Sequence, residues 1–398
     1  MFQNSSLYKE SIINFEKNFG EKPKFISYAP GRINVIGEHT DYTGGLSIPA
    51  AINCWVSASF SHRNDYKVSI YSENYQEAWK FSLDEIKQLE VQKASWKQYV
   101  KGAFVLFMEK YGMDHGISLY LQGNVPLGKG VSSSAAFEIS LLNALRKTSG
   151  EKISDQEIIL MAQQIEHNFL DVKSGLLDQF ASQFSKSGQF QIVDFSSLEN
   201  HYITAHKNFN NFYWILIDTM VERKLADSGY QERVQECDEI LKLLEEKFGK
   251  NSFRETNMSE INLIFPLKEK GEKSNLYQRA KHIISENKRT LEAKSVLESG
   301  DFFALGKLLN ETHKSLSQDY NVSCKEADFL QKVGTSHQAC IGGRMMGGGF
   351  GGGVLFLVQK GSESNFITKL LKSYKDYSGI DTDAITFDLV DGAKVCNV

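Results

Sequence analysis

The 398-residue sequence contains little proline and little cysteine, with five residues of each. The cysteines are odd in number, far apart, and not spaced like zinc ligands, so the sequence indicates neither a disulfide framework nor a zinc site. Free thiols are typical of a reducing compartment. No apolar run approaches the ~20 residues that a membrane helix needs. Residues 1–10 also lack the basic and apolar regions of a signal peptide. We therefore expect a cytoplasmic protein.

A strong excess of charge of either sign is also missing. The formal net charge is −4 and the sequence pI is near 6.2, so no basic surface for nucleic acid is indicated. The hydrophobic content of 41% and the charged content of 24% are typical of a soluble globular protein. We expect neither nucleic acid nor a membrane as a partner, and we expect a monomer. The length suggests two domains.

Hydrophobic periodicity predicts an α+β protein. Strands are predicted at 24–28, 52–60, 66–71, 116–121, 190–195, 212–218, 354–359 and 384–389. Helices are predicted at 6–18, 96–111, 132–147, 154–170, 226–248, 277–298, 302–313, 325–333 and 364–375. The first half is rich in strands and the second in helices, so we expect domains of residues 1–205 and 206–398. Residues 249–273 are expected to be irregular.

Three segments are much more specific. The first, residues 29–42, places Arg32, Glu38, His39 and Asp41 within ten residues, between glycines. These side chains combine hydrogen-bond donors with acceptors, as a pocket for a polyhydroxylated ligand requires. Charged residues of a solvated loop are the simpler interpretation. The density of polar groups beside Gly37 and Gly44 favours a ligand site.

The second segment, residues 126–136, is a glycine and serine loop that leads from a predicted strand into a predicted helix. Backbone amides at a helix N-terminus attract phosphate, and Ser132, Ser133 and Ser134 add hydroxyl groups. A single serine would suffice to cap an ordinary helix. The alternative of a Walker A loop fails at residue 130, which is glycine where that pattern needs serine or threonine.

The third segment, residues 343–353, is glycine-rich and contains a G-x-G-x-x-G spacing. A dinucleotide loop would follow a strand and open a helix, whereas this segment runs into a predicted strand. We therefore predict a turn in which the backbone closely approaches other backbone or a ligand. A purely structural turn is the alternative. Together the three segments indicate phosphoryl transfer onto a small sugar.

On these segments the sequence resembles the galactokinase family of the GHMP kinase superfamily, which also includes homoserine and mevalonate kinases. Residues 31–42 are similar to the signature that distinguishes galactokinases from their relatives. Residues 126–136 and 344–352 are similar to the phosphate loop and glycine turn of the family. The resemblance extends over residues 6–395. It implies a two-domain GHMP kinase fold with the active site between the domains, and ATP-dependent phosphorylation of galactose with Mg²⁺.

The resemblance also implies roles for individual residues. It implies that Asp178 is the catalytic acid or base and that Arg32 is its partner. The positions similar to sugar contacts are Glu38, His39, Asp41, Gly175 and Tyr230. The positions similar to nucleotide contacts are Trp96, Tyr99, Gly128, Gly130, Ser132, Ser133 and Ser134. The positions similar to magnesium ligands are Ser134 and Glu166. Helical spacing without the resemblance would place Glu166 and His167 on an exposed face, and would make Asp178 a helix cap.

The sequence departs from the family pattern at Ser174, Gly343, Met346 and Gly353, where cysteine, alanine, threonine and cysteine are usual. We expect the last three to alter loop packing near the phosphates. Two other activities stay open. One is a kinase for a related sugar such as N-acetylgalactosamine. The other is a regulator that binds galactose and ATP without turnover, which the presence of Ser134, Ala135 and Asp178 disfavours.

Overall fold

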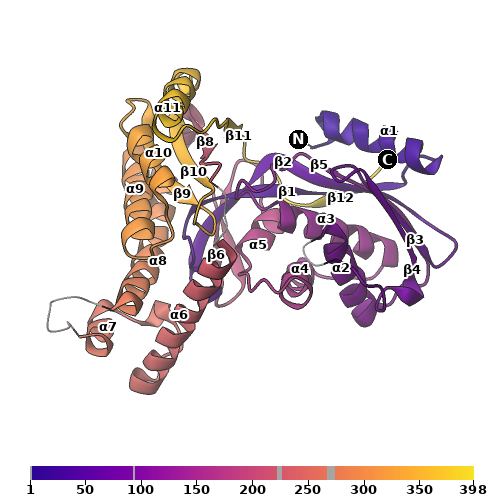
Figure 1. Cartoon of the computed structure of the whole chain (residues 1–398), viewed down its shortest axis with the longest axis horizontal. Coiled ribbons are helices and arrows are strands. Elements are labelled where there is room, and N and C mark those ends of the chain that lie inside the picture. Colours follow the sequence, from indigo (N-terminus) through magenta and orange to yellow (C-terminus); the bar gives the residue numbers. More distant parts are fainter. Residues whose placement is uncertain (1, 93–94, 222–225, 267–273) are drawn as a thin grey trace.

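The computed structural model describes residues 2–92, 95–221, 226–266 and 274–398. Two sheets, each with helices packed against it, lie next to each other, and they occupy the right and left parts of the view in Figure 1. The two described ends of the chain lie close together, beside the first helix. This agrees with the predicted α+β class.

The first sheet has eight strands, and its main path runs β12-β1-β2-β5-β3-β4, with β6 pairing β2 and β7 pairing β6. All neighbours are antiparallel except β3 and β5, which are parallel. The strands are β1 (Phe25–Ile36), β2 (Leu46–His62), β3 (Lys67–Ser72), β4 (Glu77–Ser82), β5 (Ile117–Gly123), β6 (Phe190–Asp194), β7 (Glu199–Ile203) and β12 (Lys394–Asn397).

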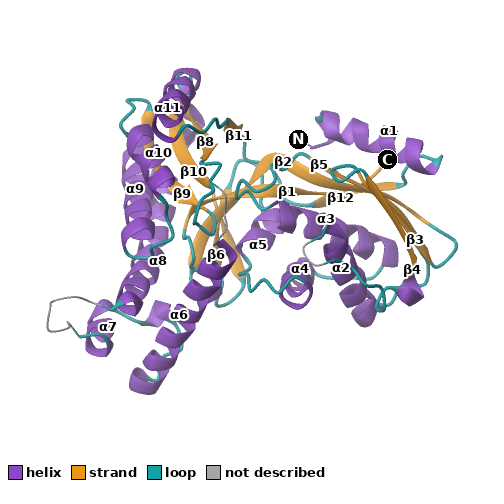
Figure 2. Cartoon of the chain, viewed as in Figure 1, coloured by secondary structure: helices purple, strands orange, loops and turns teal. Residues whose placement is uncertain are grey.

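Helices cover both faces of this sheet (Figure 2). Helix α1 (Ser6–Phe19) lies on one face and ends at Gly20, which takes the left-handed conformation. The helices on the opposite face are α2 (Trp96–Tyr111), α3 (Ser133–Ser149), α4 (Asp155–Phe169) and α5 (Leu177–Phe184). Helix α4 starts with a capping box, in which Ser154 and Glu157 each bond the other's backbone amide.

The second sheet has four antiparallel strands in the order β11-β8-β10-β9. Its strands are β8 (Phe212–Asp218), β9 (Cys340–Met346), β10 (Gly353–Gln359) and β11 (Ala384–Phe387). The accompanying helices are α6 (Ala226–Phe248), α7 (Met258–Ile264), α8 (Asn275–Ser299), α9 (Phe302–Gln318), α10 (Lys325–Thr335) and α11 (Glu363–Ser378). Short 3₁₀ turns occur at Phe2–Asn4, Asp41–Thr43, Leu83–Glu85, Lys207–Asn211 and Phe253–Glu255.

The division between residues 205 and 206 separates the two sheets except at the end of the chain. Strand β12 returns to the first sheet and pairs with β1, which would otherwise be an unpaired edge there. The two sheets also share one apolar cluster, in which Ile33 and Ile48 of the first pack with Leu216 and Leu355 of the second. The division therefore crosses this shared cluster, although each half also has a buried apolar cluster of its own.

The prediction that residues 249–273 are irregular is wrong over residues 258–264, which form α7. The Asn257 side chain accepts from the backbone amides of Ser259 and Glu260, and Glu260 bonds back to the amide of Asn257. This capping box starts a helix too short to show a clear apolar period. Residues 267–273 lie outside the described part. Strands β4, β7, β9 and β12 and helix α5 were not predicted, and most of them have seven or fewer residues.

All five cysteines are free; Cys237 and Cys340 are buried, and the other three are partly exposed. Within the described ranges, no helix has the length and apolar character that crossing a bilayer would require.

Candidate active site

Most of the residues expected at the sugar and at the reaction centre line one pocket. Its wall includes Arg32, Glu38, His39, Asp41, Glu166, Gly175, Asp178 and Tyr230. They come from strand β1 and the loop after it, from α4, α5 and the segment between them, and from α6 of the second half of the chain. Residues 347–349 of the glycine turn complete the wall. The tertiary structure thus gathers residues that are up to 317 positions apart in the sequence.

An ion pair between Arg32 and Asp178 stands at the centre of this pocket. Nε and Nη2 of Arg32 lie 2.7 and 2.6 Å from Oδ1 of Asp178. The Arg32 side chain is 6% exposed and that of Asp178 is 32% exposed, so the carboxylate faces the pocket. Arg32 also donates to the Gly130 carbonyl at 2.5 Å, and the Ser132 hydroxyl donates to Asp178. This ion pair is therefore bonded directly to the serine loop.

Asp178 lies in the first turn of α5, where the helix dipole favours a carboxylate. It does not serve as a helix cap, because the N-cap position is Leu176, which has no side-chain cap bond. Ser132 is the N-cap of α3 yet makes no cap hydrogen bond. Both features contradict the simpler structural interpretations. The Ser132 hydroxyl bonds Asp178 instead of the helix backbone, and Asp178 lines the pocket.

Asp41 and Gly175, which were both expected to contact the sugar, lie against each other in the pocket wall. A Cβ atom on Gly175 would lie 1.9 Å from Oδ2 of Asp41, so only glycine fits beside this carboxylate. The backbone amide of Leu177 donates to the same oxygen at 3.4 Å. Burial, followed by the negative charge of Asp178, raises the pKa of Asp41 to about 7.

His39 lies in the wall of the same pocket as Asp41, and its imidazole is neutral. Its φ of 63° places it in the left-handed region, and Nδ1 lies 2.9 Å from the Tyr42 hydroxyl. Burial, followed by His282 and Arg233, lowers the pKa of His39 to about 3. Nε2 is buried and bonds no described protein atom. A buried polar atom without a protein partner is unusual, and it leaves one hydrogen bond open to a water molecule or a ligand.

Glu38 makes a buried ion pair that connects the two halves of the chain. Nη1 of Arg344 lies 2.6 Å from Oε2 of Glu38, and the Arg344 side chain is fully buried. Arg344 also donates to the carbonyls of Asn34 and Val35. It fixes the backbone just before the polar loop. The sequence drew attention to residue 344 only as part of the third segment and assigned it no role.

Glu166 is buried, so the expectation from helical spacing of an exposed face is wrong for this residue. Ser174 and Gln179 donate to its Oε2, the latter at 3.0 Å. Burial raises the pKa of Glu166 to about 7, and the nearby Ser134 hydroxyl acts in the opposite direction. Ser134 is thus the hydroxyl of the serine loop that adjoins Glu166.

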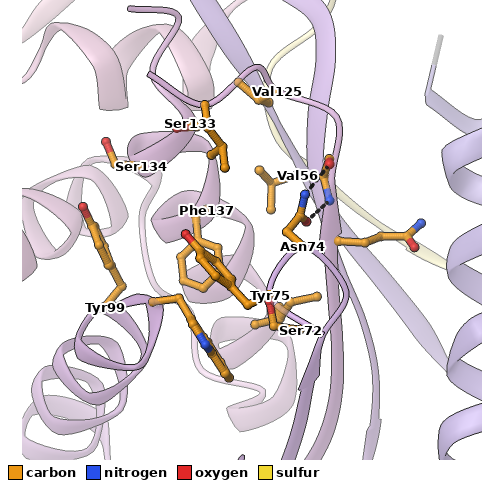
Figure 3. Close-up of a pocket in the computed structure, with 14 residues that line it drawn as sticks. Val56, Ser72, Asn74, Tyr75, Tyr99, Val125, Ser133, Ser134 and Phe137 are labelled. Carbon is orange, nitrogen blue, oxygen red and sulfur yellow. Dashed lines mark hydrogen bonds between the residues drawn. The ribbon is translucent and has the colours of Figure 1, made fainter. Parts of the chain in front are cut away.

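A second pocket adjoins the serine loop and has apolar and aromatic walls (Figure 3). Its wall includes Trp96, Tyr99, Ser133 and Ser134, as expected for a nucleotide pocket. Tyr75 also lies there, with its ring nearly parallel to that of Trp96 at a centroid separation of 6.2 Å. The lining also contains Val56, Ser72, Asn74, Leu121, Gln122, Gly123, Val125, Leu127 and Phe137. Flat apolar walls suit a purine ring, and the serine loop leads from them to Asp178.

The turns of the serine loop depend on glycine. Gly128 and Gly130 have φ angles of 74° and 75°, which other residues rarely adopt. The glycine turn of the other half packs onto this loop, since a Cβ atom on Gly347 would lie 3.8 Å from Gly130. A Cβ on Gly349 would lie 2.3 Å from the Val322 carbonyl. The predicted close backbone approach is confirmed, and the turn connects strands β9 and β10, unlike a dinucleotide loop.

The departures at Gly343, Met346 and Gly353 lie in the core, which corrects the expectation that they alter packing at the phosphates. Gly343 and Gly353 face Phe356 and Leu216, where a Cβ would come within 2.4 and 2.5 Å. Met346 is fully buried, and its sulfur accepts from the Asn34 amide at 3.3 Å. These three residues therefore affect the packing of the second sheet.

Comparison with known proteins supports the geometry. The galactokinase galactose-binding signature matches residues 13–62, and the N- and C-terminal GHMP kinase models match residues 98–186 and 293–376. A galactokinase of Lactobacillus helveticus is 35% identical over 97% of this chain and 99% of its own length. A galactokinase of Limosilactobacillus reuteri is 35% identical over 96% and 98%.

The chain belongs to the galactokinase family. The crystal structure of Lactococcus lactis galactokinase complexed with galactose superposes with a TM-score of 0.90 at 30% identity, and covers 98% of this chain and 100% of that one. A mevalonate kinase structure, at 17% identity and a TM-score of 0.65, covers 92% of this chain and 99% of its own and shares the fold. The two-domain GHMP kinase fold is confirmed.

The sequence did not reveal some residues that line or support the two pockets. Asn74 and Tyr75 line the aromatic pocket. Arg344 and Glu286 of α8 hold the polar loop from behind. The only signal for Arg344 is a charged residue among glycines. The α8 residues carry no such signal, because polar positions are normal in an amphipathic helix.

Proposed function

We propose that this protein transfers the γ-phosphoryl group of ATP to the anomeric hydroxyl of galactose, giving galactose 1-phosphate and ADP. One observation carries the proposal. The Arg32–Asp178 pair lies where the polar pocket meets the serine loop, and the loop leads to the aromatic pocket. A sugar in the first pocket and a nucleotide in the second would meet at Asp178.

The chemistry follows from this order of groups. The anomeric oxygen attacks the γ-phosphorus, and the bond from phosphorus to the ADP oxygen breaks. Asp178 orients the hydroxyl and accepts its proton as the new bond forms. Arg32 compensates the charge of Asp178 and lies close enough to stabilise the transferring oxygens. The amides at the start of α3 hold the phosphates, since they lack partners within the helix.

Mg²⁺ fits the oxygen atoms on the nucleotide side of Asp178. Glu166 and Ser134 would hold it, and both are hard oxygen ligands of the kind Mg²⁺ prefers. Burial, followed by the charge of Glu166, raises the pKa of nearby Glu138 well above its usual value. A cation there would compensate this concentration of buried acids. When bound, Mg²⁺ neutralises charge on the phosphate oxygens.

Selection of galactose rests on Glu38, His39, Asp41, Gly175 and Tyr230. The free Nε2 of His39 and the carboxylate of Asp41 can each bond a hydroxyl. A pocket that bonds one hydroxyl strongly rejects an isomer that misplaces it, because its own polar groups then lack partners. We also propose that the protein acts as a monomer in the cytoplasm.

A coupled ADP-release assay over galactose, glucose and N-acetylgalactosamine tests the function. We expect turnover with galactose and almost none with glucose. Comparable turnover with N-acetylgalactosamine would instead indicate the related kinase, and no turnover with any sugar would indicate a regulator.

Asp178→Asn should fold, bind both substrates and lose activity on the order of 10²-fold or more, because an amide cannot accept the proton. Wild-type kcat in that variant would contradict the role of Asp178.

A further inference from the structure

The loop that carries the sugar-side residues is held from behind by helix α8 of the other half of the chain. Oε1 of Glu286 accepts from the backbone amides of Gly37 at 2.9 Å and Glu38 at 3.3 Å. The next residue, Asn287, accepts from the amide of Leu46 at 2.8 Å. Two consecutive residues of α8 therefore hold both ends of the segment that presents His39 and Asp41.

Glu286 is fully buried and belongs to a compact polar network. Its Oε2 lies 2.7 Å from Nη2 of Arg289 and accepts from the Thr312 hydroxyl at 2.9 Å. Burial alone would raise the pKa of Glu286, but Arg289 and the other nearby groups lower it to about 2. The carboxylate is thus ionised, and its bonds to the loop amides are charge-assisted and strong.

The loop needs this support because its backbone is unusual. Gly37 has a φ of 92° and His39 a φ of 63°, and the second value is costly for a residue with a side chain. Such conformations persist only where the surroundings impose them. His282, one turn before Glu286 on α8, adds a contact of 3.2 Å to the Glu38 carbonyl.

We propose that Glu286 is a positioning residue for the sugar, which fixes the loop of residues 37–41 so that His39 and Asp41 meet the galactose hydroxyls. Glu286 does not line the pocket and acts through the loop backbone. This inference rests on the proposed function. It makes the sugar site dependent on a helix from the second half of the chain, while the aromatic pocket is built from the first half alone.

The test compares how the substitution changes the KM for galactose and the KM for ATP. Glu286→Gln keeps the shape but removes the charge, and it leaves Arg289 without its partner. Loss of a charge-assisted bond predicts a galactose KM about tenfold to a hundredfold higher. We expect the ATP KM to stay within about twofold. Glu292→Gln on the same helix is the matched control, since that side chain is 51% exposed, and it should match the wild type.

A second pair of variants guards against misfolding of Glu286→Gln. Thr312→Val removes the hydroxyl that bonds Glu286 while keeping the volume, and Thr312→Ser keeps the hydroxyl. Thr312→Val should raise the galactose KM several-fold, and Thr312→Ser should stay close to the wild type. Equal rises in both KM values, or an unchanged galactose KM in Glu286→Gln and Thr312→Val, would overturn the inference. Wild-type protein inactive on galactose would instead refute the proposed function.

Discussion

Replacement of Gly175 by alanine tests the sugar pocket through one added methyl group. In the native structure the new Cβ would lie 1.9 Å from Oδ2 of Asp41 and 2.2 Å from its Cγ. To restore an ordinary contact of 3.4 Å, the carboxylate must move by about 1.5 Å. That shift is enough to break a hydrogen bond, because the donor and acceptor atoms of such bonds lie only ~2.7–3.2 Å apart.

The size of the effect follows from what Asp41 contributes. A hydrogen bond to a charged group contributes about 1.5–3 kcal/mol, which corresponds to roughly ten- to a hundredfold in kcat/KM. We expect Gly175→Ala to lower kcat/KM for galactose by this factor and to leave the ATP KM nearly unchanged. Asp41→Ala should have a similar effect. Steady-state kinetics with each substrate varied in turn provide the measurement.

A double-mutant cycle separates this mechanism from a general disturbance of the loop. Once Asp41 is alanine, the space beside residue 175 is open, so Gly175→Ala should cost little more. The double variant should therefore resemble Asp41→Ala alone. If the two losses multiplied, the methyl group would act elsewhere and the reasoning would be refuted. Thermal melting of all three variants confirms that the fraction of folded protein is the same.

Two further outcomes follow from the structure. Lys129→Ala should change kcat/KM by less than about tenfold, because the ammonium group pairs with Asp383 and backbone amides hold the phosphates. A large loss of kcat in this variant would instead support the Walker A alternative. With the pKa of Asp41 raised to about 7, kcat/KM for galactose should rise as pH passes through 7, and Asp41→Asn should flatten that rise. The folded state binds this proton up to a higher pH than the unfolded state does. The contribution of Asp41 to the free energy of unfolding should therefore fall as pH rises from about 4 to about 7, and urea unfolding of the wild type and Asp41→Asn measures it.

Much of the local structure was predictable from neighbouring residues. The end of α1 at Gly20 and the capping box of Ser154 and Glu157 depend on side chains within four positions of one another. The polar loop after β1 and the serine loop before α3 are likewise contiguous in the sequence. The resemblance to galactokinases added that Asp178 and Arg32 form a pair, and the structure confirms it.

Short elements and buried supports were not predictable in the same way. Helix α7 and strand β12 are too short to show a period, and β12 forms because β1 offers it an edge. In the sequence, Glu166 is one of several polar residues of an amphipathic helix. Only the packing of α3 and α5 against that helix makes it buried. The core positions of Gly343 and Gly353 were misjudged, because their sequence neighbours are the glycines of the turn.

The sequence by itself determined which chemical groups this protein carries and the local turns that present them. The tertiary structure decided which of these groups meet. Arg344 reaches Glu38 across 306 positions, and Glu286 reaches the Gly37 amide across 249. Spacing along the chain carries no information about such contacts, because they depend on how two sheets and their helices pack around a shared apolar cluster. The charges at these contacts are then buried. Burial lowers the pKa of His39 and raises that of Asp41, whereas the positive groups that the fold places around Glu286 lower its pKa against the effect of burial.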